Sequence, residues 1–353
     1  MSVFLPYFVL IVCVLLYMIV VSRVPLSKNV QPFWLVFIVL FIFCALRDPS
    51  CYRDMPNYEA YFLRGYFIEG DASENVNIGY DFLNKLFKVF TDNFYVFSFV
   101  ITFVILVPHF NFIRKYSSSP YLSIAIFIFV AYFYCFFLLR QYLAVAASLI
   151  AFTYLLKKKQ LWFLVWAIIA ASMHTSALVI IPVYYICLIP KKKLYLIIIF
   201  AAAIVLIASL QIVASQFFAF SEYYSRYLNS DYEATPIRLF MKAFFLFLYL
   251  LAMRKDAYRD GMPFFVLICI IIENILFFGS SGIDGIYRLK SYFEVGEVIG
   301  IPMMLQVMRK RTRNQRFIIK SGVSIYMLLL AMSCVSFIIS GCFDGGYRTF
   351  LFK

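Results

Sequence analysis

The stretch YLSIAIFIFVAYFYCFFLLRQYLAVAASLIAFTYLL, residues 121–156, decides the class of fold. It holds one charged side chain, Arg140, and consists otherwise almost entirely of apolar and aromatic residues. A helix needs about 20 apolar residues to cross a hydrocarbon core of about 30 Å, and this stretch approaches that length twice, with a turn near Arg140. It therefore predicts a hairpin of membrane helices.

The rest of the chain has the same character. Of 353 residues, 64% are hydrophobic and only 14% are charged, whereas a soluble chain is about half apolar and a quarter charged. Apolar segments recur from Val3 to Ser340, so residues 1–353 are expected to form a single all-α, polytopic integral membrane domain. The net charge of +14 is explained by basic cytoplasmic loops, and no nucleic-acid partner is expected.

Basic residues give the expected orientation, because cytoplasmic loops collect Lys and Arg. The dense clusters are Arg23/Lys28, Arg114-Lys115, 157–159, 191–193, 254–259 and 309–320. If all six clusters lie on the cytoplasmic side, the chain crosses the membrane outward and back between consecutive clusters. Both termini then lie on the outer side.

This arrangement predicts about twelve membrane helices and two substantial outer segments, 47–88 and 214–236. The first outer segment is expected to contain an amphipathic helix. The hairpin 160–189 is too short for two comfortable crossings, so broken or recessed helices are expected there, with His174 below the outer surface. The expected helices are 3–22, 31–46, 89–112, 121–138, 141–156, 160–173, 175–189, 194–213, 237–252, 262–279, 291–308 and 321–340.

The outer side of this topology is rich in arginine. The planar guanidinium suits bidentate recognition of phosphate and carboxylate, so arginines from separate helix ends indicate an anionic ligand from the outer leaflet. The alternative is that they form surface ion pairs with nearby acidic residues. The eight are Arg47, Arg53, Arg64, Arg140, Arg226, Arg238, Arg288 and Arg348.

Several of these arginines stand beside other polar or aromatic residues. Arg140 ends an apolar run, where a charge is costly unless it is used or reaches the interface. Asp54 and Tyr58 share a helical face, although Asp54 is also a good N-cap for that helix. Arg288 and Tyr292 share another face at i, i+4.

Other chemistry is not indicated. The chain has no P-loop, dinucleotide fingerprint, HExxH or nucleophile elbow, and its two histidines and scattered cysteines show no metal-ligand spacing. Glu273, Glu294 and Glu297 are ionisable residues in or beside apolar spans, and such residues are functional candidates. Their partners are not evident from the sequence.

Four blocks in order resemble the EpsG/Wzy family of bacterial exopolysaccharide and O-antigen polymerases along most of the chain. An early Arg precedes a Gly-x-Asp-x-x-x-Tyr-x-x-x-Phe block, in which Tyr52 stands in place of the Gly, two residues before Asp54. An Arg-Gln-x-x-Ala block, a His-x-Ser-Ala block and a late Tyr-Arg-x-x-x-Tyr-Phe block follow. In this sequence the blocks are Arg47 with Asp54, Tyr58 and Phe62; Arg140, Gln141 and Ala144; His174, Ser176 and Ala177; and Tyr287, Arg288, Tyr292 and Phe293.

The resemblance implies a C-type glycosyltransferase fold in the bacterial inner membrane. The enzyme would transfer a growing glycan from undecaprenyl pyrophosphate onto a lipid-linked repeat unit at the periplasmic face, without nucleotide sugar, metal or other cofactor. Membrane lipids and a chain-length regulator are further implied partners. The implied proton acceptors are Asp54, His174 or Glu222, and the implied substrate-binding residues are Arg47, Tyr58, Arg140, Gln141, Arg288, Tyr292 and Arg348.

Alternative functions remain at this point. A flippase or transporter of lipid-linked oligosaccharide would need polar residues through its spans, and the inner halves of these helices are apolar. An O-antigen ligase would use similar substrates. A membrane acyltransferase would place its His on a cytosol-linked channel, whereas His174 is expected to face outward.

Overall fold

The computed structural model describes residues 4–23, 31–65, 77–189, 202, 205, 236–279, 288–339 and 347–349. This described part is helical, with one isolated antiparallel bridge between Arg47 and Thr349. Five of its helices are long and apolar enough to cross a membrane, and six shorter apolar helices accompany them. The prediction of an all-α membrane protein is confirmed.

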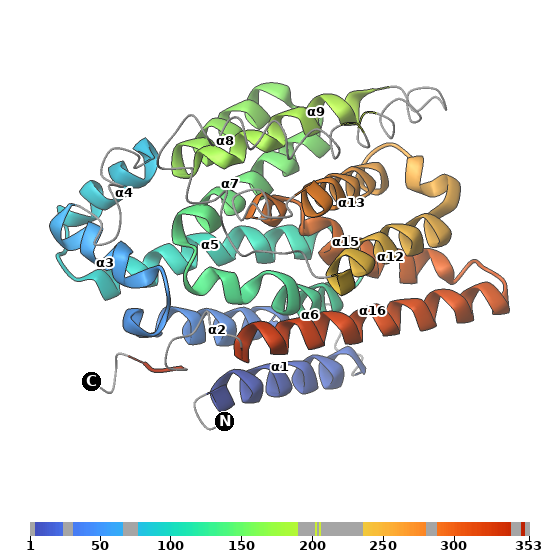
Figure 1. The fold of residues 1–353 in the computed structure, drawn as a ribbon, viewed down its shortest axis with the longest axis horizontal. Coiled ribbons are helices and arrows are strands. Elements are labelled where there is room, and N and C mark those ends of the chain that lie inside the picture. Colours follow the sequence, from blue (N-terminus) through green and yellow to red (C-terminus); the bar gives the residue numbers. More distant parts are fainter. Residues whose placement is uncertain are drawn as a thin grey trace.

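The first half of the chain supplies one group of helices (Figure 1). Helix α7 packs against both α5 and α8, and its small residues Ala144, Ser148 and Ala151 are buried where neighbouring helices approach. The elements are α1 (Leu5–Arg23), α2 (Gln31–Ala45), η2 (Pro49–Cys51), α3 (Met55–Arg64), α4 (Ile78–Lys88), α5 (Phe94–Tyr116), α6 (Pro120–Val130), η4 (Tyr132–Phe136), α7 (Leu139–Leu156), α8 (Gln160–Met173), η5 (Thr175–Ile180) and α9 (Ile181–Leu188).

The second half adds a group in which α12, α13, α15 and α16 contact one another. The expected helices 237–252 and 262–279 agree with α12 and α13, while α16 begins earlier than the expected 321. The expected helix 194–213 and most of the outer segment 214–236 lie outside the described residues. The elements are α12 (Pro236–Met253), η6 (Arg254–Tyr258), α13 (Met262–Gly279), η7 (Lys290–Tyr292), α15 (Val295–Met308) and α16 (Arg313–Ile339).

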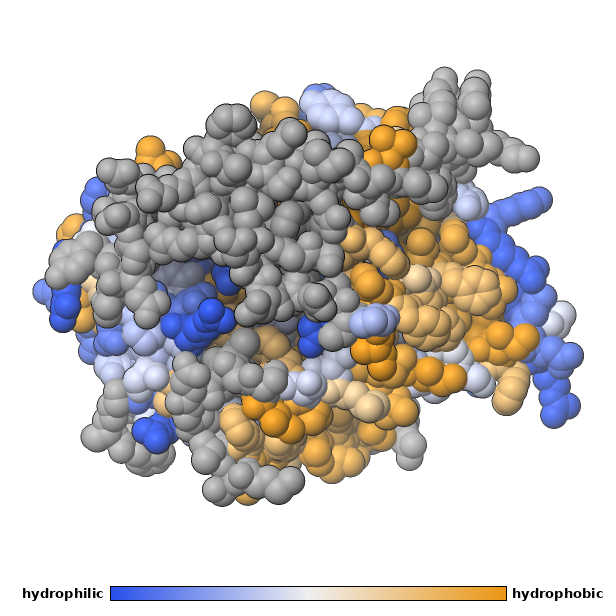
Figure 2. Space-filling view, in the orientation of Figure 1, coloured by the Kyte–Doolittle hydropathy of each residue, from blue (hydrophilic) through white to orange (hydrophobic). Residues whose placement is uncertain are grey.

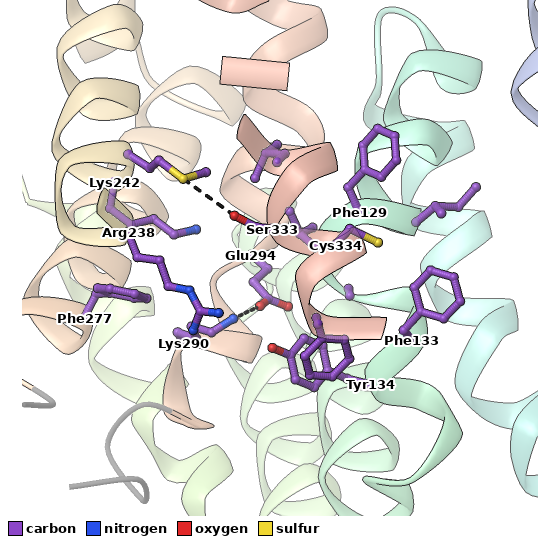
Figure 3. Close-up of a pocket in the computed structure, with 16 residues that line it drawn as sticks. Phe129, Phe133, Tyr134, Arg238, Lys242, Phe277, Lys290, Glu294, Ser333 and Cys334 are labelled. Carbon is purple, nitrogen blue, oxygen red and sulfur yellow. Dashed lines mark hydrogen bonds and ion pairs between the residues drawn. The ribbon is translucent and has the colours of Figure 1, made fainter. Parts of the chain in front are cut away.

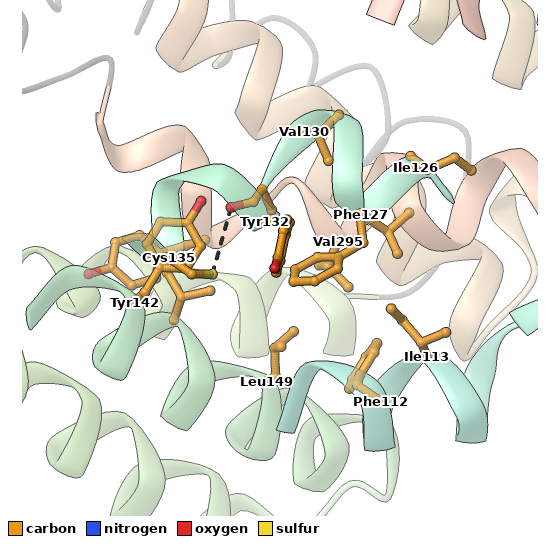
Figure 4. Packing of buried hydrophobic residues seen from close by; sticks show 14 of the residues in the cluster. Phe112, Ile113, Ile126, Phe127, Val130, Tyr132, Cys135, Tyr142, Leu149 and Val295 are labelled. Atoms are coloured by element: carbon orange, nitrogen blue, oxygen red, sulfur yellow. Dashed lines mark hydrogen bonds between the residues drawn. The ribbon is translucent and has the colours of Figure 1, made fainter. Parts of the chain in front are cut away.

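Both short hairpins contain broken helices. The sequence predicted a break for 160–189, whereas 121–138 was expected to form one continuous helix. The expected helix 121–138 ends at Val130 and continues as the 3-10 segment η4. The Tyr132 hydroxyl in η4 donates to the carbonyl of Leu40 at 2.7 Å, and aromatic side chains pack below the break (Figure 4). The expected helix 175–189 likewise opens as η5 before α9. These breaks shorten the helices and bring their ends into the bundle.

The basic clusters meet at one end of the bundle. Lys158 Nζ lies 2.8 Å from Asp260 Oδ2, Lys157 lies close to Lys115, and Arg311 donates to the carbonyl of Ala252 at 3.1 Å. Four of the six predicted clusters therefore lie at the same end of the helix bundle. Figure 2 shows an apolar band between this hydrophilic end, on the right, and another over α3 and α4 on the left.

Buried ion pairs connect the second group of helices. Lys242 Nζ on α12 lies 2.5 Å from Glu273 Oε1 on α13 and 2.5 Å from Glu297 Oε1 on α15. The Tyr326 hydroxyl on α16 also donates to Glu297. The two glutamates and Tyr326 are almost inaccessible. These contacts supply the partners of two glutamates that the sequence left unassigned.

We expect Lys242→Met to destabilise the protein by about 3–5 kcal/mol, because it leaves two buried carboxylates without their cation. A triple variant that also carries Glu273→Gln and Glu297→Gln removes the uncompensated charge and recovers most of that loss. The thermal unfolding midpoint in detergent measures both effects. A Lys242→Met protein as stable as the wild type would contradict this account of the cluster.

The two ends of the bundle should lie on opposite sides of the membrane. In a variant whose eight cysteines are replaced by alanine, a single cysteine at exposed Arg53 should react with an impermeant maleimide from outside the cell. A single cysteine at exposed Ser118, beside the Arg114-Lys115 cluster, should react only after the membrane is opened. Labelling of both positions from the same side would overturn the topology.

Candidate functional site

Three of the sequence blocks meet at the short turn η7. Gln141, in the first turn of α7, donates from Nε2 to the carbonyl of Arg288 at 2.6 Å and to Ser291 Oγ at 2.8 Å. Gln141 is buried. Its side-chain amide hydrogens therefore hold the turn η7 and Arg288, which precedes it.

The His-x-Ser-Ala block reaches the same turn through a chain of hydrogen bonds. Ser176 Oγ lies 2.6 Å from His174 Nδ1 and 2.8 Å from the hydroxyl of Tyr292. The backbone N–H of Ser176 also donates to His174 Nδ1, so Nδ1 is an acceptor and the proton of the neutral ring sits on Nε2. Tyr292 then donates to Ser176, which donates to His174.

His174 lies at the bend between α8 and η5, where it is half-buried. Burial, assisted by the positive charges of Arg140 and Arg288, lowers the pKa of His174 from 6.5 to about 3. The imidazole is therefore neutral at physiological pH, and its Nε2–H is a donor. This favours a role as hydrogen-bond donor to an anion over a role as proton acceptor.

Arg140 faces the segment 47–88. Its guanidinium carbon lies 5.7 Å from the ring centroid of Tyr58 and 5.9 Å from that of Tyr80, within the range of cation–π attraction. Burial raises the pKa of Tyr58, with Asp54 adding to the shift and Arg140 and Arg288 opposing it. The Tyr58 side chain is therefore surrounded by three charged groups, those of Asp54, Arg140 and Arg288.

The fit of α4 against α8 keeps this region compact. A Cβ atom on Gly79 would meet Ser172 Oγ at 2.3 Å, so the close approach requires glycine. It brings Tyr80, which follows Gly79, beside Arg140.

Asp54 stands at the N-cap position of α3, but its carboxylate makes no capping hydrogen bond. The carboxylate of Asp54 therefore does not cap α3, which was the structural role that the sequence offered for it.

Arg47 has a different environment from the other arginines. It is only 1% exposed, and it donates from Nε to the carbonyl of Phe136 at 2.7 Å and from Nη1 to Thr102 Oγ1 at 3.0 Å. Its guanidinium also contacts the Met55 sulfur. Arg47 therefore joins the start of the outer segment to η4 and α5.

The remaining predicted residues lie apart from this cluster or outside the described chain. Arg348 is exposed, and its carbonyl accepts from the backbone N–H of Asp48 at 2.8 Å. Tyr52, at the position of the family's glycine, is buried with its hydroxyl 2.9 Å from that of Tyr7. Glu222 lies outside the described residues.

The sequence missed two lysines. Lys242 and Lys290 are both buried against glutamates. Lys290 pairs with Glu294 one turn later (Figure 3), and Glu294 also accepts from the hydroxyl of Tyr142 at 3.4 Å. The i, i+4 spacing of Lys290 and Glu294 was the available signal, whereas Lys242 and its glutamates are far apart in the chain.

Together these residues form a cationic site at one end of the bundle. Two arginines and a neutral imidazole N–H can bind an anion, and Asp54 can accept a proton beside them. Among the described residues, no three His, Cys, Asp or Glu side chains gather so as to hold a metal ion.

The helices and this site define a polytopic, all-helical membrane protein with a cationic site among its helix ends and outer loop. The chain belongs to the EpsG family, whose model matches residues 30–344, and EpsG proteins are part of the Wzy-like polymerase group. Neither the curated proteins nor the solved structures include a match to the chain.

The lowered pKa of His174 predicts a pH-dependent stability. Below pH 6.5 the unfolded chain binds a proton at this residue, but the folded protein does so only near pH 3, so stability falls as the pH is lowered through that window. His174→Asn keeps an acceptor for Ser176 and does not titrate.

Between pH 7 and pH 5 we expect the wild type to lose about 1 kcal/mol more than His174→Asn. Thermal unfolding in detergent at both pH values measures the difference. Equal losses in the two proteins would show that His174 is protonated in the folded state as readily as in the unfolded chain.

Proposed function

We propose that this protein is a polysaccharide polymerase of the inner membrane, a C-type glycosyltransferase with about twelve spans. It transfers a growing glycan from undecaprenyl pyrophosphate onto the terminal sugar of a lipid-linked repeat unit at the periplasmic face. Membership of the EpsG family supports the polymerase class. The observation that carries the mechanism is the convergence of Arg140, Arg288, His174 and Asp54.

In this proposal Arg140 and Arg288 bind the pyrophosphate of the donor lipid. The Nε2–H group of His174 donates a hydrogen bond to a phosphate oxygen and keeps its proton, since Ser176 holds Nδ1 as an acceptor. As the bond between the anomeric carbon and pyrophosphate breaks, the leaving group takes the electron pair. Positive charge placed there in advance stabilises the negative charge that develops on the leaving group. The glycan is already activated by its linkage to pyrophosphate, so no nucleotide sugar is needed.

Asp54 is the proposed general base. It would take the proton from the acceptor hydroxyl as the oxygen attacks the anomeric carbon. Its carboxylate makes no capping hydrogen bond, and Arg140 and Tyr58 stand beside it. Glu222 remains the alternative base. Tyr58, whose ring lies beside Arg140, would contact a sugar ring or the lipid phosphate.

The other predicted residues have supporting roles in this proposal. Gln141 positions Arg288, and Tyr292 positions His174 through Ser176. Arg47 holds the loop that carries Asp54, and exposed Arg348 is a further contact for the anionic substrate. A chain-length regulator would act as partner of the assembled enzyme.

Reconstitution with a lipid-linked repeat unit tests the reaction. A polymerase converts the repeat unit into a ladder of lengths, whereas an O-antigen ligase with a lipid A core acceptor gives a single shift. A flippase leaves the repeat unit chemically unchanged. Absence of any longer product from folded, reconstituted protein would exclude the polymerase.

Arg140→Lys tests the binding assignment, because lysine keeps the charge but lacks the planar fork. Loss of such a transition-state contact typically costs about 10²-fold in rate, and we expect a loss of that order in ladder formation. Arg64→Lys, an exposed substitution at the end of α3, is the matched control and should retain normal activity. Normal activity of Arg140→Lys would remove Arg140 from the site.

A further inference from the structure

Helix α4 (Ile78–Lys88) presents three different faces, of which one belongs to the candidate site. On that face Tyr80 is fully buried and lies beside Tyr58 and Arg140. The helix has 11 residues, or about 16 Å at 1.5 Å per residue, and is too short to cross a membrane. The side chains on its other two faces therefore need an explanation other than a membrane span.

The second face is an exposed apolar stripe. Ile78, Phe82 and Leu86 follow one another at intervals of four residues, and Val89 comes three residues later with helical backbone angles. This spacing places all four on one side of the helix, and we call them the α4 stripe. Their exposed fractions are 80%, 62%, 41% and 78%. Large apolar side chains gathered on one exposed face mark a contact with a membrane or with another protein.

The third face of α4 is charged and lies beside the stripe. Asp81 Oδ2 and Lys85 Nζ form an ion pair at 2.6 Å, in which the lysine side chain is 75% exposed. Exposed Lys88 donates from Nζ to the carbonyl of Leu63 at 2.8 Å. A helix that carries an apolar stripe next to a charged one is suited to lie along the surface of a bilayer, with its apolar side in the lipid.

The first end of α4 lies against an apolar helix of the bundle. Helix α4 packs on α8 (Figure 1), and Gly79 approaches the Ser172 side chain there. Ile168 precedes Ser172 by one helical turn, on the same face of α8, and is 65% exposed. Ile78, the first residue of the stripe, therefore continues the exposed apolar side of α8.

The other end of α4 leads into a helix that is long and apolar enough to cross a membrane. Residues 89–93 connect α4 to Phe94, the first residue of α5. Phe90 in this connection is 79% exposed, and Val96 in the first turn of α5 is 47% exposed. The stripe thus joins the exposed apolar surfaces of α5 and α8, which favours lipid as the material that covers it.

We propose that α4 is an interfacial helix whose stripe lies among the acyl chains of the leaflet at the end of the bundle that carries the candidate site. Asp81, Lys85 and Lys88 then lie at the level of the lipid headgroups. The inference stands on the faces and the position of α4 and does not depend on the polymerase activity. Because Tyr80 contacts Arg140 from the opposite side of α4, the lipid contact of the stripe sets the depth of that pair in the membrane.

Spin labelling of the full chain in phospholipid nanodiscs tests the proposal. In the variant whose eight cysteines are replaced by alanine, a nitroxide is attached to a single cysteine at Phe82 in the stripe or at Lys85 on the charged face. Relaxation by oxygen reports hydrocarbon, and relaxation by a water-soluble nickel chelate reports water. We expect oxygen to dominate at Phe82, about 5–10 Å below the phosphates, and the nickel chelate to dominate at Lys85.

A charge placed in the stripe tests whether the stripe itself holds α4 in the lipid. Val89→Asp, combined with the label at Phe82, should shift the ratio of oxygen to nickel relaxation toward the value found at Lys85, because a carboxylate is costly in hydrocarbon. Lys85→Gln changes the charge by the same one unit on the charged face. It is the matched control and should leave the ratio at Phe82 unchanged.

Gel filtration and the unfolding midpoint identify the variants that remain folded, and the comparison of the two labels does not require the Val89→Asp variant. Dominant nickel relaxation at Phe82 would overturn the proposal by showing that the stripe lies in water. Protection of the Phe82 label from both reagents would overturn it by showing that protein, such as a second copy of the chain, covers the stripe. An unchanged ratio in folded Val89→Asp would contradict the role of the stripe in holding the helix.

Discussion

A polar side chain inside an apolar helix bundle has to find its partner within the protein, and this constraint shapes the structure around η7. The turn is short and directly precedes the apolar helix α15. Gln141 holds one side of it through Arg288 and Ser291, and Ser176 holds the other through Tyr292. Because water does not compete inside the bundle, these few hydrogen bonds can determine where the guanidinium of Arg288 and the imidazole of His174 lie.

The same constraint divides the charged residues into two kinds. Arg47 and the Lys242 cluster are enclosed by protein and connect elements that are distant in the chain. Arg140 and Arg288 are only partly buried and lie with the outer loop. A guanidinium whose donors are directed to protein carbonyls stabilises the fold, whereas one beside tyrosine faces and a neutral imidazole remains suited to a ligand.

The proposed reaction follows from this division. An anionic leaving group requires positive charge placed before the bond breaks, and the partly buried arginines provide it. His174 contributes a donor because its other nitrogen accepts from Ser176. The outer loop supplies Asp54, and buried Arg47 anchors that loop to η4 and α5. In the proposed reaction, the fully enclosed residues position the ones that would meet substrate.

Much of this protein was evident from the sequence. Apolar length predicted an all-helical membrane protein, the basic clusters predicted the end at which Lys158 and Arg311 meet, and the short hairpin 160–189 predicted the break at η5. The break at η4 falls within a helix that was expected to be continuous. The four family blocks also named the residues that gather around Arg140. Each of these inferences rests on local properties, because length, charge and spacing act along the chain.

Only the tertiary structure decided which side chains meet. Arg47 resembled a ligand-binding arginine but lies enclosed, and Gln141 holds a turn 147 positions away. Nothing along the chain singled out Lys242, yet it joins glutamates from two other helices. The sequence specifies how costly each buried charge is, but helix packing decides which partner compensates that cost, and partners brought together from distant helices leave no periodic signal in the chain.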